Sequence, residues 1–182
     1  NSRYLMIRIA EPSTLDGYAI REITVQPLEW SATIDDFFHA IAQEYPRGDY
    51  PRAITGEKAY WTILGASGGE HEALFNEDGL LETAKASFSI EPFLQVDGTL
   101  VTWNNVDAEQ SLEEGYIPIP CVRWVSGDFE LTVTPFATGE ELIYGRYLLK
   151  NNAAVTTEVT LYLAIRPFQV NPPWQSLNMP GG

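Results

Sequence analysis

The fold class is decided by one stretch of alternating side chains, Phe129-Glu130-Leu131-Thr132-Val133-Thr134-Pro135-Phe136. Successive side chains of a β-strand point to opposite faces, so the alternation places Phe129, Leu131 and Val133 together on one face. The same alternation, or a β-branched and aromatic composition, marks other segments as strands, namely residues 4–9, 18–25, 60–64, 87–91, 99–103, 142–149 and 155–165. The sequence therefore predicts an all-β protein.

Turn signals separate these segments at short intervals. Asp78-Gly79 and Asp97-Gly98 are typical of two-residue hairpin loops. Gly127-Asp128 and Asn151-Asn152 also favour turns, because glycine and asparagine tolerate the left-handed backbone conformation. Short strands spaced in this way indicate an antiparallel β-sandwich or barrel.

One short helix is expected before the strands. Thr33 is a good N-cap, and Asp36 completes a capping box three residues later. Apolar side chains then share one stripe, which comprises Ile34, Phe37, Phe38, Ile41 and Tyr45. Pro46 cannot continue a helix, so the predicted helix covers about residues 34–45.

The helix lies in a predicted linker. Residues 45–55 contain two prolines and a glycine, which indicate an extended connector. We therefore expect three parts: residues 1–27, a linker at 28–56, and a β domain at 57–182.

Composition excludes several functional classes. The 182 residues include 11 Lys and Arg against 25 Asp and Glu, which gives a formal net charge of −14. Nucleic acids and anionic membranes are bound by clustered cations, so neither is an expected partner. No apolar run approaches the roughly 20 residues of a membrane-spanning helix.

The chain termini and the single cysteine do not identify the cellular compartment. The chain begins at Asn1 without a Met or a charged leader and stops at Gly182 in a Pro- and Gly-containing stretch. We interpret it as a piece of a longer polypeptide whose targeting signal is not in view, which leaves the compartment open. Cys121 is the single cysteine, so an internal disulfide and a thiolate metal cluster are excluded, and we expect a small buried hydrophobe.

Patterns that suggest catalysis fail in context. Gly65-Ala66-Ser67-Gly68-Gly69 matches a G-x-S-x-G nucleophile elbow, but the motif needs a following helix and a later histidine, and none follows His71. A flexible glycine turn is expected instead. His39 and His71 lack metal-ligand spacing, and no carboxylate pair stands out as a glycosidase pair, so we expect no catalytic residue, metal or cofactor.

Aromatic residues are the most suggestive feature. Five tryptophans and nine tyrosines suit stacking on sugar faces, although a sandwich core is the expected role for most of them. Prolines in the C-terminal segment forbid a regular strand and favour a fixed loop. The candidate carbohydrate-binding residues of this loop are Arg166, Gln169, Asn171, Trp174 and Gln175. The alternative is a hydrogen-bonded loop that only locks the sandwich to its neighbour.

Two resemblances give these features a context. Arg3-Tyr4-Leu5-Met6-Ile7-Arg8 and residues 17–25 resemble the closing strands of a discoidin-like jelly roll. Residues 27–182 resemble a segment of large bacterial proteins that place a discoidin-like region before an α/α six-hairpin glycosidase-like barrel. The stretches that carry this second resemblance are residues 27–33, Phe88-Ser89-Ile90-Glu91-Pro92-Phe93, Gly115-Tyr116-Ile117-Pro118-Ile119-Pro120 and residues 166–182.

The resemblance implies a super-sandwich like that of galactose mutarotase, preceded by the end of a discoidin-like domain. In such enzymes the barrel supplies the catalytic acid and base. We therefore expect a non-catalytic β-sandwich module of a glycoside hydrolase-like, carbohydrate-active protein. Its expected partners are carbohydrate and other domains of the same polypeptide. Two alternatives stay open: an autonomous carbohydrate-binding module, and a mutarotase-like enzyme with a histidine and a carboxylate in one cleft.

Overall fold

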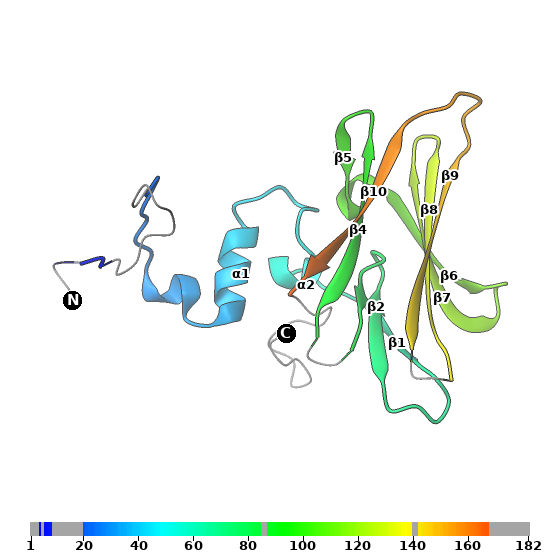
Figure 1. Cartoon of the computed structure of the whole chain (residues 1–182), viewed down its shortest axis with the longest axis horizontal. Coiled ribbons are helices and arrows are strands. Elements are labelled where there is room, and N and C mark those ends of the chain that lie inside the picture. The colour runs from blue at the N-terminus through cyan, green and yellow to red at the C-terminus, as the bar shows by residue number, and fades with distance from the viewer. Residues whose placement is uncertain (1–3, 5, 9–19, 85–86, 140–141, 168–182) are drawn as a thin grey trace, which may run out of the picture.

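The described residues form ten strands, two α-helices and two 3-10 helices (Figure 1). The structure is a computed structural model that describes residue 4 and residues 6–8, 20–84, 87–139 and 142–167. In chain order its elements are η1 (Leu28–Ser31), α1 (Ile34–Ala42), α2 (Arg52–Thr55), β1 (Trp61–Gly65), β2 (Glu72–Asn76), β3 (Leu81–Glu82), β4 (Ser89–Val96), β5 (Thr99–Val101), η2 (Trp103–Asn105), β6 (Asp107–Glu113), β7 (Ile117–Ser126), β8 (Phe129–Ala137), β9 (Ile143–Asn151) and β10 (Val159–Arg166).

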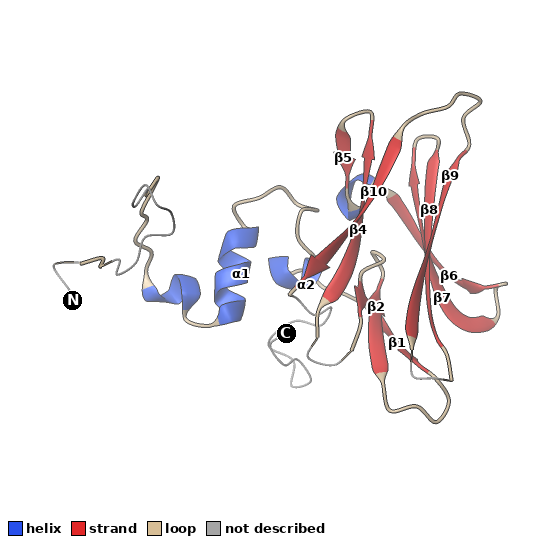
Figure 2. Cartoon of the chain, in the orientation of Figure 1, coloured by secondary structure: helices blue, strands red, loops and turns tan. Residues whose placement is uncertain are grey.

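The strands form two antiparallel sheets that pack face to face (Figure 2). The first sheet has the order β1-β2-β3-β4-β10, and β5 also pairs with β4. The second sheet has the order β6-β7-β8-β9. The predicted all-β antiparallel sandwich is confirmed, and the two separate sheets decide against the barrel.

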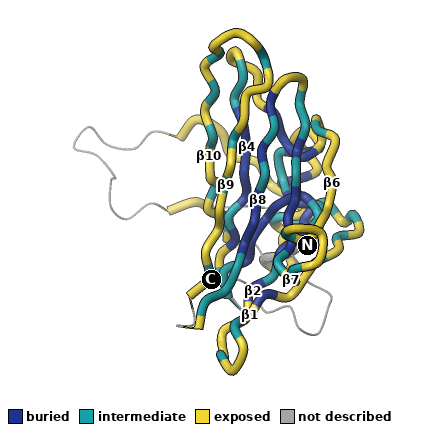
Figure 3. Tube along the Cα trace, turned by 90° about the vertical axis from the view of Figure 1, so that its right-hand side faces the viewer, coloured by how far each residue is buried: buried dark blue, intermediate teal, exposed yellow. Residues whose placement is uncertain are grey.

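The core lies between the two sheets, as the alternation at residues 129–136 predicts. Phe129, Leu131 and Val133 are 8%, 0% and 0% exposed. They belong to one face of β8 and meet apolar side chains of the first sheet, among them Phe75 and Leu94. Figure 3 shows this buried centre, with β6 exposed along almost its whole length.

The predicted turns at Asp97-Gly98 and Gly127-Asp128 are confirmed as two-residue connections, whereas the connection at Asp78-Gly79 comprises four residues, 77–80. Asp97-Gly98 joins β4 to β5 with a positive φ at both residues, as a two-residue hairpin loop requires. Asp78-Gly79 lies between β2 and β3, where the Asn76 side-chain oxygen accepts hydrogen bonds from the backbone N–H groups of Asp78 and Leu80. Gly127-Asp128 joins β7 to β8.

Helix α1 begins as predicted and ends earlier. Both hydrogen bonds of the capping box between Thr33 and Asp36 are present. The helix stops at Ala42, because the backbone N–H groups of Glu44 and Tyr45 bond three residues back rather than four. This tightening is typical of a last turn in front of a proline, whose ring disfavours the helical conformation of the preceding residue.

The connector after α1 contains a helical turn that the sequence analysis places in extended backbone. Helix α2 begins after Pro51 and ends at Gly56, which has a left-handed φ of +80°. Proline before a helix and glycine after it are the usual boundary residues, so Pro51 and Gly56 were a sequence signal for this helix. Ala42 of α1 packs on Ile54 of α2.

The strand predicted at residues 18–25 is wrong for its described part. Residues 20–25 are not a strand, and Ile20, Ile23 and Val25 are more than half exposed. Residues 4 and 6–8 are not in a strand either. A strand needs a neighbour to pair with, and no described strand lies beside these residues.

Replacing Leu131 with Ala is expected to lower the free energy of unfolding by about 2–5 kcal/mol, because the side chain is fully buried between the sheets. Urea denaturation of the purified chain measures this. Leu148→Ala on neighbouring β9 is the matched control, since Leu148 is 60% exposed and its loss should change stability by about 0.5 kcal/mol or less. Equal losses would contradict the assigned core.

Candidate functional site

A groove of about 380 Å³ opens where the sheet edges at β1 and β6 face each other. Residues 60–62 and 75–77 line it from the first sheet, and residues 110–112 and 120–122 line it from the second. The groove is therefore lined by four sequence segments, two from each sheet, which only the packing of the sheets brings together.

The strand registers explain the chemistry of the groove. Thr62 pairs with Phe75, and Gln110 pairs with Val122, so each polar side chain shares a face with a buried apolar neighbour. Phe75 and Val122 are each 2% exposed, whereas Tyr60 is 68% exposed at the rim. The result is an apolar floor with an aromatic and polar rim.

Glu77 is the carboxylate of this lining. Its Oε2 accepts a hydrogen bond of 2.8 Å from the backbone N–H of Tyr60, and its own N–H donates to the Tyr60 carbonyl oxygen. Burial raises the pKa of Glu77, although the hydrogen bond from the Tyr60 N–H to its carboxylate and Arg52 at 3.7 Å act in the opposite direction. Glu77 therefore fixes the backbone of Tyr60 beside the groove.

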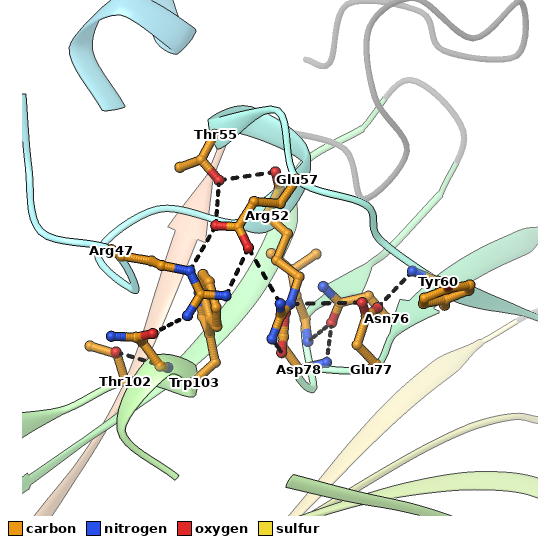
Figure 4. A network of polar contacts seen from close by, with 12 residues as sticks. Arg47, Arg52, Thr55, Glu57, Tyr60, Asn76, Glu77, Asp78, Thr102 and Trp103 are labelled. Carbon is orange, nitrogen blue, oxygen red and sulfur yellow. Dashed lines mark hydrogen bonds and ion pairs between the residues drawn. The ribbon is translucent and has the colours of Figure 1, made fainter. Parts of the chain in front are cut away.

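Next to the groove, a network of arginines and carboxylates ties the connector to the sandwich (Figure 4). Arg52 donates hydrogen bonds of 2.6 and 3.0 Å to the two carboxylate oxygens of Asp78. The guanidinium carbons of Arg52 and Arg47 lie 4.2 and 4.5 Å from the ring centroid of Trp103. Glu57 bonds Arg47 at 2.7 Å, which joins the two arginines into one network. These contacts are structural, since each charged group is paired within the chain.

Arg166, a predicted sugar contact, makes hydrogen bonds and aromatic contacts within the chain. Its Nε donates a hydrogen bond of 2.9 Å to Glu91 Oε2, and its Nη2 donates one of 2.5 Å to the carbonyl oxygen of Asp49. Its guanidinium carbon lies 5.2 Å from the Tyr50 ring and 5.3 Å from the Phe93 ring. Arg166, the last residue of β10, therefore links this strand to β4 and to the connector, and its role in sugar binding stays a prediction.

The other candidate residues, Gln169, Asn171, Trp174 and Gln175, lie outside the described residues. Their role in carbohydrate binding stays a prediction. Tyr60 and Gln110, which line the groove, were not among the residues predicted from the sequence. The adjacent aromatic residues Tyr60 and Trp61 could have indicated a binding surface, but the sequence did not predict that β6 lies opposite them.

The remaining tryptophans are divided between core and surface. Trp103 and Trp124 are 3% and 1% exposed, as expected for core residues. Trp30 packs edge-on against Phe37 of α1 at 5.3 Å, and Trp61 is partly buried in β1. Trp124 also donates a hydrogen bond of 3.0 Å to the Asp78 carbonyl oxygen, so the indole has a partner inside the core.

The expected glycine turn at residues 65–69 and the expected burial of Cys121 are confirmed. The glycine-rich stretch after β1 leads into β2 rather than a helix, so the nucleophile elbow is absent there. Cys121 is 6% exposed, and burial raises its pKa. His39 Nδ1 lies 2.8 Å from the Ile54 carbonyl oxygen, and neither it nor His71 lines the groove. Among the described residues, no three His, Cys, Asp or Glu side chains could hold a metal ion together.

Glu91 should make stability depend on pH. Burial raises its pKa from 4.5 to about 8 despite the opposing charge of Arg166. The folded state then favours the protonated acid, so this stabilisation is complete below about pH 4.5 and is lost as pH rises towards 8. Each tenfold change in proton affinity corresponds to about 1.4 kcal/mol.

The measurement is urea denaturation between pH 5 and about pH 8 for the wild type and Glu91→Gln. The glutamine keeps an acceptor for Arg166 but does not titrate. The wild type should lose stability relative to the variant as the pH rises. Parallel profiles would show that Glu91 is already ionised throughout.

In the described part of the chain, no helix is both long and apolar enough to cross a membrane. No protein-family model matches the chain, and no curated protein or solved structure is significantly similar to it. The resemblance to discoidin-like and glycosidase-associated segments therefore stays a prediction.

Proposed function

We propose that the chain is a non-catalytic β-sandwich module of a carbohydrate-active, glycoside hydrolase-like protein. In that protein it packs on a further domain and shapes the substrate cleft. The observation that carries the proposal is an uncovered apolar edge of the sandwich, at the end of β10.

This edge is made by side chains that belong to the core face. Leu163 pairs with Pro92 and Ile165 pairs with Ile90, which places both on the inner face of the first sheet. They are nevertheless 45% and 73% exposed. On the facing sheet, β9 has Gly145 near Leu81, so this position of β9 contributes no side chain to the space between the sheets.

An open core face is a different feature from a single exposed apolar residue, which is normal on protein surfaces. Covering Leu163 and Ile165 would remove apolar area from water and stabilise an assembly. A domain of the same polypeptide is the proposed partner, because it is present at high effective concentration beside this edge.

The groove supports a non-catalytic role. Glycosidases use two carboxyl groups placed about 5–9.5 Å apart across the sugar. Glu77 is the carboxylate among the residues that line the groove, and it is engaged with the Tyr60 backbone. A mutarotase-like site would need a histidine in the cleft, and neither His39 nor His71 lines this one.

Amide hydrogen exchange tests the packing. The proposal implies a longer polypeptide, and the isolated chain is compared with that polypeptide. Amides of β9 and β10 should exchange more slowly in the longer polypeptide, because a domain covers this edge there. The β4–β5 hairpin at Asp97-Gly98 is the internal control and should not change. Equal exchange at β9 and β10 in both samples would refute the packing.

A parallel assay tests the absence of catalysis. The isolated chain is incubated with chromogenic glycosides and with freshly dissolved α-glucose. Both hydrolysis and anomerisation should proceed at the rate of buffer alone. Anomerisation that His71→Ala abolishes would instead establish the mutarotase-like alternative.

A further inference from the structure

We propose that the groove between β1 and β6 binds a neutral mono- or disaccharide. This ligand class deepens the proposed function and rests on it. It also moves sugar recognition away from the C-terminal residues, to a surface built by Tyr60, Gln110 and their neighbours.

Size and shape are the first argument. A volume of about 380 Å³ lies at the lower end of the roughly 300–1,000 Å³ typical of small-molecule pockets. The floor is closed by Phe75 and Val122, which the two sheets hold rigidly in the core. The site is therefore largely formed before a ligand arrives, which lowers the entropy cost of binding.

The lining matches a ligand with both apolar and hydroxyl-bearing faces. Tyr60 offers an exposed aromatic ring at the rim, suited to the C–H face of a sugar ring. Gln110 has an amide that both donates and accepts hydrogen bonds, and Thr62 and Ser111 have hydroxyl groups. Such neutral groups suit sugar hydroxyls, which also both donate and accept.

The charges of the lining decide against anionic ligands. Among the described residues no Lys or Arg lines the groove, so these residues offer no cation to a phosphate or carboxylate there. Glu77 adds negative charge, and the whole chain has a formal net charge of −14. Nucleotides and acidic peptides are therefore disfavoured, whereas a neutral sugar meets no electrostatic penalty.

The rim is also positioned before binding. Glu77 holds the Tyr60 backbone through two hydrogen bonds, one to its N–H and one from its own N–H to the Tyr60 carbonyl oxygen. The neighbouring Asp78 is anchored by Arg52. The Tyr60 backbone is consequently tied to the end of β2 rather than left as a loose loop.

An extended peptide paired to the edge of β6 is the competing occupant. Asp107, Glu109 and Glu113 place charge along this strand, and charged edge strands resist pairing with another chain. Glu109 and Glu113 are also bonded to Arg123 and Arg146. An added strand would lie beside these charged side chains, which disfavours an apolar peptide and leaves the saccharide as the proposed occupant.

The test is a titration of the ¹⁵N-labelled chain with glucose, galactose, xylose, maltose and cellobiose, followed by amide chemical shifts. We expect at least one sugar to shift the amides of residues 60–62, 75–77, 110–112, 121 and 122, and few others. Tyr60→Ala should weaken binding about tenfold, and Gln110→Ala should weaken it measurably. Tyr116→Ala is the matched control, because Tyr116 is 74% exposed and lies outside the groove.

Each other outcome overturns the inference. Failure of all five sugars to shift the groove of a folded chain would do so. So would shifts located elsewhere, or binding that Tyr60→Ala leaves unchanged. These results are separable from the domain-packing test. Sugar binding without slower exchange at β9 and β10 would support the autonomous carbohydrate-binding module, whereas slower exchange without sugar binding would leave a scaffold alone.

Discussion

Asp78 is the residue at which three parts of the molecule meet. Its carboxylate accepts two hydrogen bonds from Arg52 of the connector, and its carbonyl oxygen accepts one from Trp124 of the second sheet. Its backbone N–H donates to Asn76 at the end of β2. Because Asp78 is 3% exposed, removal of any one partner would leave a buried polar group unsatisfied. Burial raises the pKa of this carboxyl group, whereas the hydrogen bond and charge of Arg52 lower it. Arg52 therefore offsets part of the cost of burying the charged carboxylate.

Two adjacent residues of one turn therefore have different tasks. Asp78 holds the connector against the sandwich, while Glu77 fixes the Tyr60 backbone at the groove. The two open edges of the sandwich also differ in chemistry. The β1–β6 edge has an apolar floor and a polar aromatic rim, which suits a small hydroxyl-rich ligand. The β9–β10 edge exposes Leu163 and Ile165, which suits a packed domain.

The local pattern of the sequence was a good guide wherever structure depends on neighbours in the chain. The alternation at residues 129–136 predicted the core face of β8, and Thr33 with Asp36 predicted the start of α1. The same pattern failed at residues 20–25, because alternation shows which residues could form a strand and cannot supply a partner strand. The hydrogen bonds of Arg166 to Glu91 and Asp49 were not predictable in the same way, because both partners lie far from Arg166 in the sequence.

The sequence by itself determined the all-β class, the hairpin turns and the acidic surface, since periodicity, turn residues and charge are properties of local composition. Only the tertiary structure decided where a ligand could bind. Tyr60 and Gln110 are about fifty residues apart, and they line one groove because two separate sheets place their edge strands side by side. No local sequence pattern predicts that Tyr60 and Gln110 lie near each other in space, because their proximity depends on how the apolar faces of the two sheets pack around Phe75 and Val122.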